Sequence, residues 1–152
     1  MSRPKFVYVT YIRTTPARLW KALTDPEITC QYFCATRMES DWQPGSPWRM
    51  MIPDGRVADG GEVLEVEPER RMVLSWRNEF RPELKAEGYA RLTYEIEQVG
   101  ELIKLTVVHE SDIPDSKLIE AVSNGWPLIL ASLKSLIETG EALDATRKWC
   151  HG

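Results

Sequence analysis

The stretch Ser116–Thr139 reads SKLIEAVSNGWPLILASLKSLIET, and it is the only long segment of the chain with sustained helical periodicity. Its apolar residues recur at spacings of three and four, which places them on one stripe of a helix. These residues are Val122, Trp126, Ile129, Leu130, Leu133, Leu136 and Ile137. Asp115 or Ser116 can cap the start of the helix, and Gly140 can end it. Pro127 predicts either a kink or a short turn before a main helix that begins at Trp126.

A helix with such a stripe needs an apolar surface to lie on, because each large apolar side chain contributes about 1.5–3 kcal/mol when it is fully buried. The preceding sequence predicts that surface. Residues 36–109 alternate apolar and polar side chains with period two, and turn residues interrupt the alternation. This pattern is typical of antiparallel strands with one face toward a core and the other toward water.

The N-terminal segment completes the expected architecture. Residues 5–12 (KFVYVTYI) are β-branched and aromatic almost throughout, which favours a first strand. Thr15-Pro16 and Asp25-Pro26 each combine a capping residue with a proline at the first helical position, which predicts two short helices. The second would run from Pro26 to about Phe33. Gly60-Gly61 indicates a bulge in a strand, and residues 78–87 read as a polar loop.

We therefore expect an α+β fold in which a curved antiparallel sheet of about seven strands wraps around one long C-terminal helix. The chain has 152 residues, the usual size of a single domain. We expect one domain over residues 1–152, with a core at about residues 5–140 and a weakly helical tail at residues 141–152 that frays.

Composition excludes several classes of function. The net charge of −4 comes from interspersed acidic and basic residues, without the basic stripe of a nucleic-acid-binding protein. No apolar run approaches the roughly 20 residues of a membrane span, and the N-terminal sequence lacks a signal-peptide hydrophobic region. We expect a cytoplasmic protein that binds no nucleic acid and does not insert stably into membranes.

The number of cysteines also favours a cytoplasmic protein. The three cysteines are expected as reduced thiols, as is usual in the cytosol. A zinc site built from Cys30, Cys34, Cys150 and His151 is the alternative, but the spacing matches none of the common short zinc motifs. No phosphate-binding loop, nucleophile elbow or zinc-protease motif occurs in the sequence. We expect no metal and no cofactor.

The order of predicted elements resembles the helix-grip, START-like superfamily, also called SRPBCC, which includes the birch pollen allergens and the polyketide cyclases. Within it the chain is most similar to the family named for the activator of the Hsp90 ATPase, from about Lys5 to Gly140. The segments that carry the resemblance are Thr15-Pro16 with Leu19-Trp20 and Leu23-Thr24, Gly61-Glu62-Val63, Glu67-Pro68, Leu74-Ser75-Trp76, Leu92-Thr93-Tyr94-Glu95, Leu105-Thr106, Gly125-Trp126 with Leu130, Leu133-Lys134, and Glu138-Thr139-Gly140. The resemblance implies a fold with a cavity between sheet and helix, and no catalytic motif.

The candidate site residues are those that strand alternation and the apolar stripe of the C-terminal helix turn toward that cavity. We predict that the cavity is lined by Trp48, Met50, Trp76, Tyr94, His109, Trp126, Leu130 and Leu133. His109 could anchor a ligand or transfer a proton, since the imidazole pKa normally lies near neutrality. The alternative for His109 is a structural histidine with a hydrogen-bonded partner, and for the aromatic residues it is plain core packing. Glu62 is either a carboxylate near the cavity or a solvated charge.

Three functions are compatible with this reading. The first is binding of a small hydrophobic or aromatic molecule, lipids included, which predicts a cavity of a few hundred cubic ångströms. The second is a cyclase-like or hydrolase-like enzyme that uses His109 or Tyr94 in the same cavity. The third is a co-chaperone-like interaction module with a chaperone partner. A homodimer is compatible with each, and the first function is our leading hypothesis.

Overall fold

The computed structural model describes residues 4–150 and contains one seven-stranded antiparallel sheet. The strands are β1 (Lys5–Ile12), β2 (Arg37–Ser40), β3 (Pro47–Met51), β4 (Val57–Glu67), β5 (Arg71–Asn78), β6 (Ala90–Val99) and β7 (Leu102–Glu110). The helices are α1 (Pro16–Thr24), α2 (Pro26–Tyr32), α3 (Pro82–Lys85) and α4 (Lys117–Thr139), followed by the 3₁₀ turn η1 (Asp144–Thr146).

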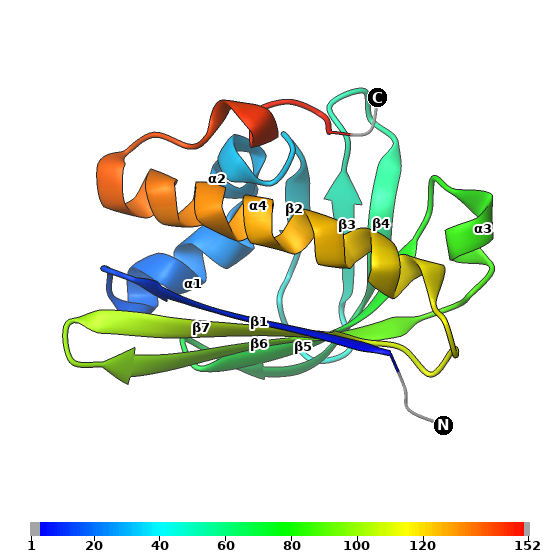
Figure 1. Ribbon diagram of the computed structural model, residues 1–152, viewed down its shortest axis with the longest axis horizontal. Helices are drawn as coiled ribbons and strands as arrows, with labels where there is room; N and C mark the ends of the chain where they lie inside the picture. The colour runs from blue at the N-terminus through cyan, green and yellow to red at the C-terminus, as the bar shows by residue number, and fades with distance from the viewer. Residues whose placement is uncertain (1–3, 151–152) are drawn as a thin grey trace.

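The sheet is strongly curved, and α4 lies across its concave side. The strand order is β1-β7-β6-β5-β4-β3-β2, so β1 pairs with β7 and every other neighbour follows in sequence. In Figure 1 the strands β1, β7, β6 and β5 run below α4, while β2, β3 and β4 stand upright behind it. The short helices α1 and α2 cover one end of the space between the sheet and α4. This arrangement confirms the predicted helix-grip architecture.

Helix α4 has the predicted ends. The Ser116 hydroxyl accepts a hydrogen bond from the Ile119 N–H at 3.2 Å, and Gly140 ends the helix with a φ of 87°. The helix continues without interruption through Pro127, so the predicted alternative of a turn before Trp126 is wrong. Trp126 and Leu130 are buried against the sheet on either side of the proline. This packing outweighs the backbone hydrogen bond that proline cannot make.

The prediction of a bulge at Gly60-Gly61 is wrong. Gly60 pairs regularly with Arg49, and Gly61 pairs with Trp48. The register of β4 shifts elsewhere, between Val63 and Glu65 against β5, and between Met50 and Met51 on its other neighbour. Gly61 is needed because a Cβ atom there would lie 2.1 Å from the Ser75 carbonyl oxygen. A glycine inside a strand can mark such a close backbone approach as well as a bulge.

The segment after β5 is more ordered than the predicted polar loop. The short helix α3 forms within it and buries Leu84. The Asn78 side-chain oxygen accepts a hydrogen bond from the Arg81 N–H at 2.9 Å, which fixes the start of the turn. No helix within residues 4–150 is long and apolar enough to cross a lipid bilayer.

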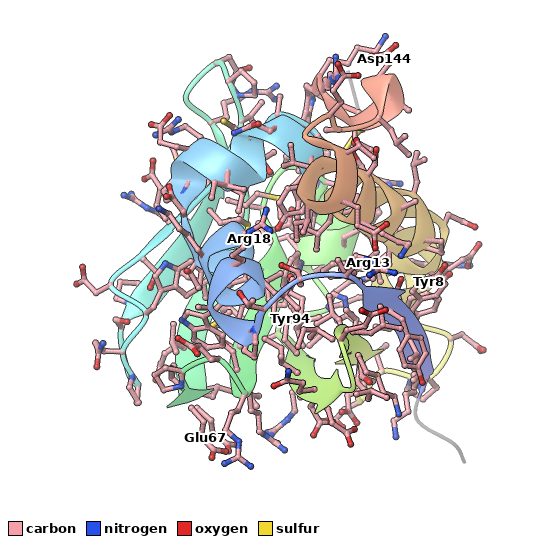
Figure 2. All side chains as sticks on the ribbon, turned by 90° about the vertical axis from the view of Figure 1, so that its left-hand side faces the viewer. Tyr8, Arg13, Arg18, Glu67, Tyr94 and Asp144 are labelled. Carbon is pink, nitrogen blue, oxygen red and sulfur yellow. A yellow bond between two sulfur atoms is a disulfide. The ribbon has the colours of Figure 1, made fainter. Side chains whose placement is uncertain are left out.

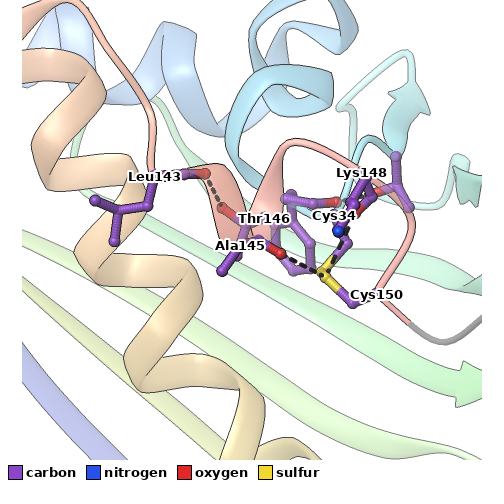
Figure 3. Close-up of a disulfide and its surroundings, with 8 residues drawn as sticks. Cys34, Leu143, Ala145, Thr146, Lys148 and Cys150 are labelled. Carbon is purple, nitrogen blue, oxygen red and sulfur yellow. Dashed lines mark hydrogen bonds between the residues drawn. A yellow bond between two sulfur atoms is a disulfide. The ribbon is translucent and has the colours of Figure 1, made fainter.

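A disulfide ties the C-terminal tail to the loop after α2, and Figure 3 shows this bond between Cys34 and Cys150. The two Cα atoms lie 5.3 Å apart although 116 residues separate them in sequence. The prediction of three reduced thiols is therefore wrong for Cys34 and Cys150, and only Cys30 is free. The long separation hid the pair, because sequence spacing does not show which distant segments meet in space.

The disulfide also bears on the zinc alternative and on the tail. Two of the four candidate zinc ligands are joined to each other, and His151 lies outside the described residues. Residues 4–150 contain no group of three histidine, cysteine or acidic side chains arranged for a metal ion. Within the tail, Ala142 and Thr146 are buried, and residues 144–146 form the 3₁₀ turn η1.

Candidate functional site

A cavity of about 100 Å³ lies between α4 and the end of the sheet formed by β3, β4 and β5. Three of its residues, Met50, Asp59 and Asn78, are cross-strand partners and so lie side by side on the sheet. Helix α4 lines the opposite wall with small and aliphatic residues, among them Ala121 and Ile129. The outer rim carries the half-buried rings of Phe80 and Trp149 and the exposed Arg81.

The cavity is smaller than the few hundred cubic ångströms that the leading hypothesis predicted, because aromatic rings occupy much of the space between sheet and helix. The ring centroids of Trp48 and Trp76 lie 4.6 Å apart, and those of Trp76 and Trp126 lie 6.0 Å apart. Phe33 meets Trp126 edge to face with 5.5 Å between centroids. A cavity of roughly 150 Å³ can hold benzene. A one-ring ligand would therefore place part of its surface at the rim.

The predicted site residues divide into two groups. Met50, Trp76 and Trp126 line the cavity. The others are buried in the core next to it rather than on its wall, and they are Trp48, Tyr94, His109, Leu130 and Leu133. In Figure 2 the labelled Tyr94 points into the interior of the molecule, whereas the labelled Glu67 on β4 points away from it. Strand alternation and helical periodicity therefore predicted which side chains are buried but not where the cavity lies among them.

His109 is fully buried behind the cavity, between the rings of Trp76 and Trp126. Its Nδ1 accepts a hydrogen bond from the Trp126 indole N–H at 3.1 Å, which places the imidazole proton on Nε2. Within residues 4–150 that buried Nε2 has no hydrogen-bond partner. Burial lowers the His109 pKa to about 3, so the ring is neutral at physiological pH.

The indole N–H groups of the cluster are already used within the protein. Trp48 donates to the Ser75 carbonyl oxygen at 2.8 Å, and Trp76 donates to a carboxylate oxygen of Asp59 at 2.7 Å. The third indole, Trp126, donates to His109. Each bond fixes the orientation of its ring. The tryptophans therefore present ring surfaces rather than N–H donors to the cavity.

Asp59 is a polar residue of the cavity that was not predicted from the sequence. It is only 7% exposed and lines the cavity from near the start of β4. Burial raises its pKa to about 7, against the opposing effect of hydrogen bonds from Trp76 and Asn78, and the nearby charge of Glu79 adds to the rise. The signal in the sequence was an aspartate between Ala58 and two glycines inside a predicted strand, where acidic residues are disfavoured.

The other acidic candidate lies apart from this group. Glu62 is exposed, and its contact with β5 is made by its backbone, whose N–H donates to the Ser75 hydroxyl at 2.8 Å. Its side chain does not line the cavity. The solvated reading of Glu62 is the one that the geometry supports.

Comparison with solved structures supports the fold. The protein MLL2253 of Mesorhizobium loti is 21% identical, with a TM-score of 0.76 over 89% of this chain and 97% of the other. The Aha1 dimer of Colwellia psychrerythraea is 14% identical, with a TM-score of 0.74 over 91% of this chain and 99% of the other. PFC0360w, an HSP90 activator from Plasmodium falciparum, is 21% identical, with a TM-score of 0.71 over 88% and 95%. At these identities the likeness extends to the fold alone.

Comparison by sequence identifies the family. No curated protein sequence is significantly similar to this chain. The family model described as "Activator of Hsp90 ATPase homolog 1-like protein" matches residues 13–138, which run from the end of β1 almost to the end of α4. The matched segment thus includes every strand and helix wall that lines the cavity. The chain belongs to the activator of Hsp90 ATPase homolog 1-like family of helix-grip proteins.

Proposed function

We propose that this protein binds a small, mainly apolar molecule in the cavity between α4 and the β3–β5 end of the sheet. The observation that carries the proposal is a cavity between two packed layers whose walls are mostly aromatic and aliphatic. Sites for small ligands are typically of this kind, with a few polar groups that fix the orientation of the ligand. Asp59 and Asn78 are such groups here.

The size of the cavity favours ligands with a single ring. The ring would lie against Trp76 and Trp126, with Met50 and Ile129 closing the sides. The remainder of the ligand would pass between Phe80 and Trp149, whose centroids are 5.3 Å apart, so one of these rings would move outward on binding. The proposed contacts keep Met50, Trp76 and Trp126 from the predicted set and add Asp59. His109 and Tyr94 would act indirectly, by holding Trp126.

The experiment that tests this proposal fills the cavity. Ala121 lines the cavity from α4, so Ala121→Phe places a ring where the ligand would lie. Ala131 is exposed on the same helix, and Ala131→Phe is the matched control. We expect toluene and benzyl alcohol to raise the melting temperature of the wild type and of Ala131→Phe in proportion to occupancy. Ala121→Phe should fold and show no such rise. Equal responses from the two variants would contradict the proposal.

The alternative proposal is a co-chaperone-like role with a protein partner. It is favoured by neighbours that are named as an Aha1 dimer and an HSP90 activator. On this chain it would use an exposed surface, and β1 offers Val7, Val9 and Tyr11 on its outer face. Filling the cavity with Ala121→Phe would leave such a role intact, so the same variant separates the two proposals.

An enzyme that uses the cavity would rely on Asp59, since His109 does not line it.

We place the protein in the cytoplasm as part of the same proposal. In that reducing compartment the Cys34–Cys150 bond would be open to reduction. The tail would then be held by its remaining contacts, which include the hydrogen bond from the Leu143 N–H to the Ser132 hydroxyl at 2.9 Å.

A further inference from the structure

The Asp59 carboxylate is buried without a positively charged partner from the described chain. The arginines of β5 and the next loop pair with other acids: Arg71 with Glu95 at 3.6 Å, Arg77 with Glu79 at 2.6 Å and Arg81 with Glu83 at 2.9 Å. The partners of Asp59 are neutral donors, namely the Trp76 indole at 2.7 Å and the Asn78 side chain. A buried carboxylate is costly unless a cation or several hydrogen bonds compensate it.

The cavity around Asp59 is lined by several aromatic rings. Five rings from five different segments of the fold line it, and they are Phe33, Trp76, Phe80, Trp126 and Trp149. Their mutual angles are tilted or edge to face. The face of an aromatic ring carries partial negative charge and attracts ammonium groups. Rings and carboxylate thus favour the same sign of charge in a ligand.

Resting on the proposed function, we infer that the cavity selects small amines, which bind as ammonium ions with the nitrogen at the Asp59 carboxylate and the apolar part against Trp76 and Trp126. Hydrogen bonds between an ammonium and a carboxylate are about twice as strong as those between neutral groups. The ligand would supply the positive partner that the described chain does not give Asp59. An alcohol of the same shape would fill the same space without that interaction.

The charged groups around Asp59 give the proposal a pH dependence. Glu79 lies close enough to raise the Asp59 pKa further, and Arg81 lines the rim but is paired with Glu83. The wall formed by α4 contributes no charged side chain, and Cys34 does not titrate because it is in the disulfide. Because the Asp59 pKa is about 7, a proton competes with the ammonium group at lower pH. Amine binding should therefore weaken as the pH falls below 7.

The test compares benzylamine with benzyl alcohol by calorimetric titration of the whole chain. At pH 8 we expect the wild type to bind benzylamine about 10-fold or more tightly than benzyl alcohol, since the amine adds a charge-assisted hydrogen bond. At pH 5.5 this preference should shrink several-fold. Asp59→Asn keeps an oxygen that can accept from Trp76, so it should still bind benzyl alcohol but lose the preference. Glu62→Gln, on the exposed side of the same strand, is the control and should keep it.

The possible outcomes separate this inference from the proposed function. The inference is overturned if the wild type binds both probes equally, or if Asp59→Asn keeps the preference for the amine. In either case, binding of benzyl alcohol would still support the proposed function. If the wild type binds neither probe, both the inference and the proposed function are overturned.

Discussion

Two buried titratable side chains, His109 and Asp59, contact the same indole ring of Trp76 from different strands. The His109 ring lies 5.1 Å from Trp76 between centroids, and Asp59 accepts the Trp76 indole N–H at 2.7 Å. Burial disfavours the charged form of each group. It therefore lowers the His109 pKa and raises the Asp59 pKa, and the two shifts affect the pH dependence of stability in opposite directions.

The sign for each group follows from where its proton is bound. Between pH 3.8 and about 7 the folded state holds a proton on Asp59 that the unfolded state has lost, so the stabilising contribution of Asp59 disappears as the pH rises. Between pH 6.5 and about 3 the unfolded state protonates His109 and the folded state does not, so that contribution disappears as the pH falls. In the window they share, the two effects oppose each other.

Single substitutions should expose each effect. Relative to wild type, Asp59→Asn should gain free energy of unfolding as the pH rises from 4 to 7, by on the order of 1–4 kcal/mol. His109→Gln, which keeps an acceptor for Trp126, should gain relative stability as the pH falls from 6.5 toward 4. Urea unfolding at several pH values measures both. Difference curves that stay flat with pH in either variant would contradict the burial argument for that residue.

The sequence predicted one of these two residues. Alternation along the last strand placed His109 on the inner face, because Leu105 and Val107 are apolar neighbours on that face. Asp59 was not predicted because the three consecutive residues Ala58, Asp59 and Gly60 are all buried, which breaks the period of two. β3 and β5 are the hydrogen-bonded neighbours of this part of β4 within the sheet.

At the scale of elements, the disulfide holds the C-terminal tail across the end of the fold. It joins the tail to the loop after α2, and the neighbouring Trp149 packs edge to face on Phe80 at the rim of the cavity. The tail therefore contributes one wall of the proposed site. Its attachment depends on one covalent bond and a few buried side chains, Ala142 and Thr146 among them.

Breaking that bond should cost measurable stability. A cross-link over 116 residues restricts the unfolded chain, and removing such a link typically costs 2–5 kcal/mol. We expect Cys150→Ser to lose about that much in urea unfolding, and the wild type to lose a similar amount when a reductant is added. Cys30→Ser removes the free thiol and is the control that should match the wild type.

The reductant provides an internal check on the same prediction. Cys150→Ser should be insensitive to the reductant, because the bond is already absent. Wild-type protein that unfolds at the same urea concentration with and without reductant would contradict the stabilising role of the disulfide.

Elements were easier to predict from sequence than their contacts. The two ends of α4 followed from Ser116 and Gly140, whose local chemistry decides how a helix starts and stops. The prediction of a turn at Pro127 was wrong because tertiary packing of Trp126 and Leu130 outweighs the tendency of proline to break a helix. The disulfide was hidden for a different reason, since pairing of Cys34 with Cys150 depends on the whole path of the chain between them.

At the scale of the whole molecule, the fold leaves space where the sheet curves away from α4, and large aromatic side chains fill most of it. The helix-grip architecture was predictable because its periodicities are long and regular. The volume of the remaining cavity was not, since it depends on how Trp48, Trp76 and Trp126 turn. Their indole hydrogen bonds to Ser75, Asp59 and His109 decide this, and only the folded structure shows those partners.

The most direct measurement of the central claim is a titration of the labelled protein with benzyl alcohol, followed through the indole N–H signals in nitrogen–proton correlation spectra. Trp76, Trp126 and Trp149 line the cavity, whereas Trp20 and Trp42 do not. We predict saturable shifts for the first three indoles and unchanged signals for Trp20 and Trp42. Signals that all stay in place, or shifts confined to Trp20 and Trp42, would contradict a ligand site between α4 and the sheet.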